Sequence, residues 1–124
     1  MPGSVLYDFG DMVRSVVPSL PEDATDFREL NWQLDRYAAL IRGFAQATRG
    51  WLSEEEIMRL PEVGGLITLE LGMRFLTDYL NGDRYFSIHH PEHNLQRCRA
   101  QLRYFSGLQT AKPWARDEVE RYFS

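Results

Sequence analysis

The sequence is short of the residues on which several classes of protein depend. Its 124 residues include one cysteine, Cys98, and one lysine, Lys112. A lone cysteine cannot form an internal disulfide, so the chain requires no oxidising compartment. No apolar run approaches the ~20 residues of a membrane-spanning helix, and the first residues lack the basic and apolar regions of a signal peptide. These absences predict a cytoplasmic protein with no membrane partner.

Positive charge is also in deficit, because the formal net charge at pH 7 is -4. A protein that binds nucleic acid needs a dense basic face, so we expect no nucleic-acid partner. What is present is an ordinary globular composition, with 44% hydrophobic and 26% charged residues. The length allows one modest hydrophobic core, and we expect residues 1–124 to form a single domain.

Helical periodicity fills most of the chain between four groups of proline and glycine residues. We expect an acidic loop over 18–26 and a short extended segment over 27–33. Residues 62–80 are apolar on almost every side and predict a central buried helix. The other predicted helices cover 6–17, Leu34 to a stop at Gly50, 53–60 with a capping box at its start, Leu95 to a break at Lys112-Pro113, and 114–123. The predicted fold class is all-α, with five or six helices and little or no sheet.

Two patterns resemble metal sites but are better explained by local structure. Asp8-Phe9-Gly10 matches the magnesium-binding signature of protein kinases, yet the strand and catalytic loop that precede that signature are missing. Asp8 is therefore interpreted as an acid near a helix N-terminus. The histidine-rich segment 85–93 has no second cluster to complete a tetrahedral site, so it predicts a polar loop and no bound metal.

Arg74 has two interpretations. Glu70 lies four residues before it and Asp78 four after it, which is the spacing of a surface ion-pair ladder. Alternatively, Arg74 reaches out of the apolar helix to bind substrate oxygens as a bidentate donor. Cys98 lies on an apolar helix face and is expected to be a small buried residue. No nucleophile and base can be paired, so no catalytic residue is assigned.

Two segments, LYDFGDMVR (6–14) and MRFLTDYLNGDRYF (73–86), resemble the bacterial N-acetylhexosamine 1-kinase branch of the aminoglycoside phosphotransferase/choline kinase superfamily. The likeness extends along the chain to the late KPW (112–114). It implies the C-terminal helical subdomain of a kinase-like fold, with Met1 an internal methionine just after the parent's metal ligand. The ATP lobe and the catalytic loop would then be absent. The full-length parent would use ATP and magnesium, and this chain would hold neither.

The same resemblance implies roles for four residues. Arg74, Tyr85 and Trp114 would line the sugar pocket, and Asp8 would brace the catalytic loop. The expected function is the acceptor-sugar-binding part of an ATP-dependent N-acetylhexosamine or sugar 1-kinase, inactive as an isolated chain. The alternatives are a fragment of another small-molecule phosphotransferase of the superfamily, or a free-standing helical interaction module. Apolar surface left by a missing lobe would also favour a homo-oligomer.

Overall fold

Four α-helices make up the part of the chain that the structure describes. The computed structural model describes residues 2–124, so the expectation about Met1 concerns a residue outside it. The helices are α1 (Pro2–Val16), α2 (Leu34–Ala47), α3 (Glu54–Leu80) and α4 (His93–Phe123). Between residues 2 and 124, extended pairing is limited to an isolated bridge from Pro18 to Trp32. The all-α prediction is confirmed, and the extended segment expected over 27–33 shrinks to this bridge.

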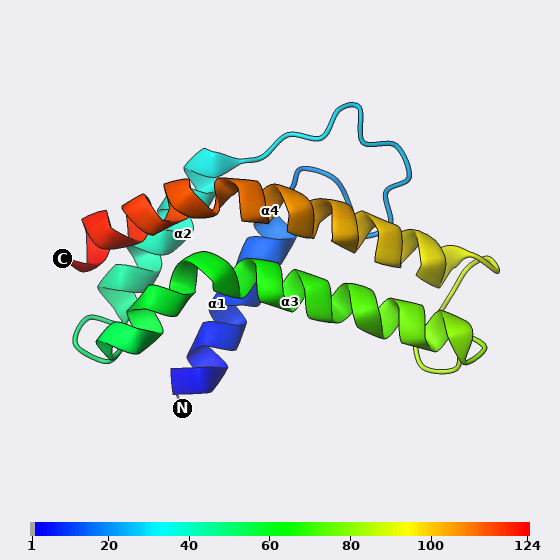
Figure 1. Ribbon diagram of the computed structural model, residues 1–124, viewed down its shortest axis with the longest axis horizontal. Helices are drawn as coiled ribbons and strands as arrows, with labels where there is room; N and C mark the ends of the chain where they lie inside the picture. Colours follow the sequence, from blue (N-terminus) through cyan, green and yellow to red (C-terminus); the bar gives the residue numbers. More distant parts are fainter. Residues whose placement is uncertain (1) are drawn as a thin grey trace.

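α3 and α4 run antiparallel along each other, and the two shorter helices pack at one end of this hairpin (Figure 1). α1 crosses α3, whereas α2 contacts α4 and α1. We call this the packed end; it contains the start of α3 and the end of α4. The opposite end, formed by the turn over residues 81–92, projects beyond α1 and α2 (Figure 1).

The two proline breaks predicted within the helical hairpin are wrong. Pro61 lies inside α3 and Pro113 inside α4. A proline removes one helical hydrogen bond and bends the helix, but tertiary packing on both sides can carry the helix through it. In Figure 1 the first turns of α3 slope away from the axis of the rest. The described residues therefore form four helices where five or six were expected.

The start of α3 is the predicted capping box. The Ser53 hydroxyl accepts the Glu56 N–H at 3.2 Å, and the Glu56 carboxylate accepts the Ser53 N–H at 2.8 Å. Both donors would otherwise lack helical partners. At the other end of α3, Asn81 caps the helix and Gly82 takes a φ of 90°, in line with the predicted Asn-Gly stop.

The hydrophobic core lies at the packed end. Its buried members come from all four helices and from Val17 just after α1, and they are Phe9, Val13, Val17, Tyr37, Ile41, Leu60, Leu108, Ala115 and Val119. Glycine allows α1 and α3 to approach closely there. A methyl group on Gly64 would overlap Val13, and one on Gly10 would overlap Val63 and Ile67. The two helices therefore interlock through one small residue each.

α3 is not buried on every side as predicted. Leu66, Met73 and Leu80 are 54%, 49% and 72% exposed. α1 and α4 cover two faces of the helix and leave the third face in solvent. No helix in residues 2–124 combines the length and the apolar character needed to cross a membrane.

The acidic loop between α1 and α2 is tied along α4 by polar contacts, and Figure 1 shows it passing beside that helix. The Tyr104 hydroxyl donates to the Pro21 carbonyl at 2.7 Å. The Gln101 amide donates to the Glu22 carbonyl at 3.1 Å. Such contacts between segments about 80 residues apart have no signature in helical periodicity, so the sequence did not reveal them.

Candidate functional site

A single carboxylate organises the projecting end. Asp78, in the last turn of α3, is buried, and its two oxygens accept hydrogen bonds from the backbone of the following turn. The donors are the N–H groups of Arg84 at 3.0 Å, Tyr85 at 2.8 Å and Phe86 at 3.0 Å. This carboxylate thus fixes where the side chains of three consecutive residues emerge.

α4 joins the same arrangement through its second residue. The Asn94 amide donates to Asp78 at 2.8 Å and to Asp83 at 3.0 Å. Burial would raise the pKa of the Asp78 carboxyl, but the backbone donors and the Asn94 amide outweigh burial and lower that pKa below its ordinary value. Asp78 therefore stays ionised as an acceptor and is not available to form the ladder with Arg74 considered above.

Arg74 instead lies against aromatic rings that this turn presents. Its guanidinium carbon is 5.7 Å from the ring centroid of Tyr85 and 5.7 Å from that of Phe86. This distance is within cation–π range. The Phe86 ring is anchored in turn on Phe75 of α3, with centroids 4.7 Å apart. Arg74 and Tyr85 are thus brought together, one from a helix and one from the turn beyond it.

A shallow hollow of about 260 Å³ opens beside this pair. Its walls combine two aromatic rings with cationic, hydroxyl, amide and carboxylate groups, supplied by Arg74, Thr77, Asp78, Asn81, Tyr85 and Phe86. Guanidinium, hydroxyl and amide groups can hydrogen-bond a polyhydroxylated ligand, and the exposed ring faces can pack on its apolar side. Thr77, Asn81 and Phe86 were not recognised in the sequence, because their roles depend on the turn that Asp78 folds.

Trp114 and Asp8 lie elsewhere. Trp114 packs on Tyr37 of α2, with ring centroids 5.4 Å apart. It is roughly 20 Å along α4 from Gln101, the residue that faces Gly72 of α3. Asp8 is exposed on α1, which crosses α3 around Gly64, far from the Arg74 turn. The structure therefore unites two of the three expected sugar-binding residues and separates the third.

The histidine-rich segment is partly helical and partly a loop. His93 begins α4, is buried, and links three parts of the chain. Its Nδ1 accepts the His89 N–H at 3.2 Å, so Nε2 carries the proton toward the Asp23 carboxylate at 2.7 Å. The hydrogen bond from His93 lowers the pKa of Asp23. Over residues 2–124, no group of three or more His, Cys, Asp or Glu side chains is arranged to hold a metal ion.

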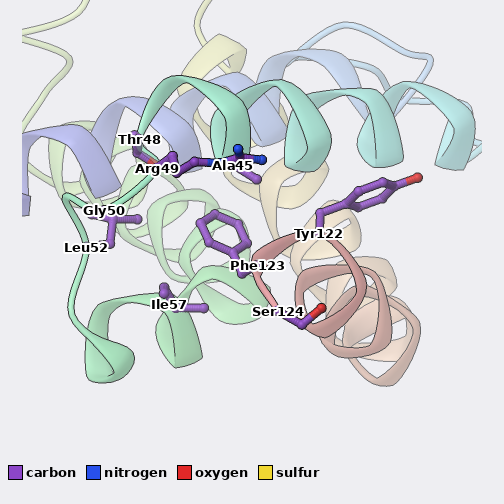
Figure 2. A pocket seen from close by; sticks show the side chains of 9 residues that line it. All are labelled: Ala45, Thr48, Arg49, Gly50, Leu52, Ile57, Tyr122, Phe123 and Ser124. Atoms are coloured by element: carbon purple, nitrogen blue, oxygen red, sulfur yellow. The ribbon is translucent and has the colours of Figure 1, made fainter.

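A second hollow, of about 300 Å³, lies at the packed end between α2, α3 and α4 (Figure 2). Phe123 points into it from the end of α4, and Ile57 faces it from α3 (Figure 2). Arg49 is the sole charged side chain among its lining residues in the described chain. Hydroxyl groups of Thr48, Tyr122 and Ser124 also line it, but no second charged side chain accompanies Arg49. The Arg74 hollow combines a cation, a carboxylate, an amide and two aromatic rings, so it is the stronger candidate.

A comparison of the sequence with known protein families finds none that matches it.

Proposed function

We propose that this chain is the acceptor-sugar-binding helical part of a phosphotransferase similar to the N-acetylhexosamine 1-kinases. In this proposal the hollow beside Arg74 and Tyr85 receives the sugar. The parent enzyme would bring ATP and magnesium to that sugar from elements outside this sequence.

The observation that carries the proposal is the meeting of Arg74 and Tyr85. The two residues are eleven positions apart, on α3 and on the turn after it, and both ring and guanidinium face the same hollow. Asp78 stabilises this geometry by binding the turn's backbone. A rigid turn suits recognition, because less conformational entropy is lost when a ligand binds.

Each group has a chemical role toward an N-acetylated sugar. The guanidinium fork of Arg74 can donate two hydrogen bonds to a pair of hydroxyls or to the amide oxygen. The Tyr85 hydroxyl can bind a further sugar oxygen, and its ring, with that of Phe86, offers an apolar face to the acetyl methyl. Trp114 has no part in this hollow, because it packs on Tyr37.

The isolated chain is not expected to transfer phosphate. Phosphoryl transfer requires magnesium, a phosphate-gripping element and a residue that orients the nucleophile. The sequence contains no glycine-rich phosphate loop and no catalytic-loop pattern of histidine, aspartate and asparagine. Steady turnover of ATP with N-acetylglucosamine by the purified chain, lost in Arg74→Ala, would contradict this part of the proposal.

Sugar binding can be tested by NMR titration of the full chain with N-acetylglucosamine and N-acetylgalactosamine. We expect roughly millimolar affinity, because the hollow is shallow. Shift changes should centre on the backbone amides of residues 74–86. Arg74→Ala should remove them, whereas Arg42→Ala, at an exposed arginine of α2, should leave them unchanged. Absence of shifts at about 100 mM sugar, or equal binding by Arg74→Ala, would refute the site.

A further inference from the structure

The exposed side of α3 carries a regular apolar stripe. Its side chains recur at alternating spacings of three and four residues, and they are Leu66, Leu69, Met73, Leu76 and Leu80. This is the a/d spacing of a helix that packs along another helix. The first, middle and last members are about half exposed or more, at 54%, 49% and 72%. We call these five residues the α3 stripe.

The other described helices leave much of the α3 stripe exposed, and only Leu69 and Leu76 within it are part-buried. α1 contacts the side of α3 that includes Gly64, where Val13 approaches. α4 contacts the side that includes Gly72, where Gln101 approaches. The stripe lies on the remaining side. Among the described residues, α1 and α4 are the helices that pack extensively on α3, and the stripe is an apolar side of α3 that neither of them fully covers.

We propose that the α3 stripe binds the α3 stripe of a second copy of this chain, with the two helices antiparallel and Met73 at the two-fold axis. This inference goes beyond the proposed function. Its apolar contact does not involve the sugar hollow, but Arg74 at its edge is shared with that hollow. The pairing also gives the hairpin a role in assembly and specifies the surface for the homo-oligomer expected from exposed apolar surface.

The spacing of the stripe favours a second copy as the occupant. A two-fold interface must be self-complementary, because where residue i contacts residue j of the partner, residue j contacts residue i of the partner. Leu66 and Leu80 lie seven residues before and after Met73. In an antiparallel pair, Leu66 of one copy therefore faces Leu80 of the other. Met73 meets its own copy, and a flexible thioether adapts well to a self-contact.

Charge along one edge of the stripe is complementary in the same arrangement. Glu70 and Arg74 are both exposed and lie on opposite sides of Met73 in sequence. Pairing two α3 helices antiparallel brings Glu70 of one copy within about 3 Å, along the helix axis, of Arg74 of the other. In a parallel pair the same edges of the two helices would lie on opposite sides of the interface, so Glu70 and Arg74 would not meet across it. In the described residues, no carboxylate lies within ion-pair distance of Arg74.

Sedimentation measures the assembly directly. A stripe of four helical turns is a small interface, so we expect a dimer with a dissociation constant of roughly 1–100 µM. Met73→Glu should weaken dimerisation at least about tenfold, since it places two carboxylates face to face. Arg42→Gln makes the same change of one charge unit on exposed α2 and should not alter the mass. A wild-type monomer at about 500 µM, or unchanged dimerisation in Met73→Glu, would overturn the proposal.

Cysteine cross-linking determines the direction of pairing. In a Cys98→Ala background, Met73→Cys should form a disulfide-linked dimer under mild oxidation. A mixture of Leu66→Cys and Leu80→Cys chains should cross-link, whereas Leu66→Cys alone should not, because its two copies lie about 21 Å apart along the axis. Cross-linking of Leu66→Cys to itself would indicate parallel helices and overturn the proposal. Circular dichroism of each variant identifies any that fail to fold.

A charge exchange gives a third readout at the edge of the stripe. Glu70→Arg and Arg74→Glu should each weaken the dimer, and the double exchange should restore it, since both intermolecular pairs are rebuilt with reversed sign. Failure of the double variant to recover dimerisation, with the single variants impaired, would overturn the antiparallel register.

Discussion

The two ends of the α3–α4 hairpin are held together by different forces. At the packed end, α1 and α2 bury a cluster of apolar side chains that includes Phe9, Ile41 and Leu60. At the projecting end, the turn over residues 81–92 is folded around the Asp78 carboxylate and the Asn94 amide. Hydrophobic burial is non-directional and tolerates small shifts. Hydrogen bonds to a buried carboxylate fix positions more narrowly.

This difference explains why the candidate site lies where it does. A site needs side chains held at defined positions, and the polar turn provides them by binding the backbone of Tyr85 and Phe86. The packed end provides stability to the molecule as a whole. We therefore expect substitutions at the packed end to change the free energy of unfolding, and substitutions at the projecting end to act mainly on local order.

The largest effect is expected at the close approach of α1 and α3. Gly64→Ala inserts a methyl group where Val13 already lies, and overpacking of this kind costs about 1–3 kcal/mol. Chemical denaturation should report the loss as a lower midpoint with an unchanged slope.

Gly43→Ala is the matched control. Gly43 lies within α2 and a methyl group there meets no neighbouring atom within 4 Å. Alanine favours the helix by about 1 kcal/mol over glycine, so this variant should be as stable as the wild type or more so. If Gly43→Ala were destabilised, or if Gly64→Ala had wild-type stability, the close approach of α1 and α3 would not explain the effect of a methyl group at Gly64.

Much of the fold could be predicted from the sequence because it depends on local pattern. The start of α2 at Leu34, the capping box at Ser53 and the stop at Asn81-Gly82 are all set by residues within a few positions of each other. The prolines at 61 and 113 were misjudged for a non-local reason. Contacts made by α1, α2 and the paired helix hold both helices straight enough to continue, and such contacts have no trace in a short window.

The candidate site was less accessible to sequence reasoning. The resemblance grouped Arg74 with Tyr85 and Trp114, and the first two do lie together. Asp78 was considered only as an ion-pair partner of Arg74, because i, i+4 spacing is visible and the fold of a later turn is not. Its backbone partners lie six to eight residues ahead and could come from any residue type, and its side-chain partner Asn94 lies sixteen residues ahead.

Asp78→Asn should produce the next largest effect and confine it to the projecting end. The asparagine amide replaces one carboxylate oxygen with an NH2 group, which donates and cannot accept. It stands where four N–H groups need an acceptor. We expect hydrogen exchange of the amides at residues 84–86 to become faster by roughly an order of magnitude, while the core amides of α1 change little. Equal acceleration of amide exchange at both ends would show that the two ends open together.

The same residue predicts an acid dependence. Because the pKa of Asp78 is lower in the folded chain than its ordinary value of 3.8, its contribution to stability is complete above about pH 4 and is lost as the pH falls through the folded value. The wild type should therefore lose protection of residues 84–86 on acidification below that pH. Asp78→Asn should lack this pH-dependent step, and exchange measured from pH 5 downward would detect it.

The smallest effect is expected for the link between α4 and the acidic loop. Tyr104→Phe removes the hydrogen bond to the Pro21 carbonyl, worth about 1 kcal/mol, and water can reach Pro21 in compensation because that residue is exposed. Burial, with the nearby Asp23 charge, raises the pKa of Tyr104 from 10.0 to about 12. Because this pKa is raised in the folded chain, the Tyr104 hydroxyl contributes its full stabilisation below pH 10. That contribution is lost as the pH rises toward 12. The stability difference between wild type and variant should therefore shrink across this range. A difference independent of pH would mean that the Tyr104 hydroxyl contributes through packing and not through its proton.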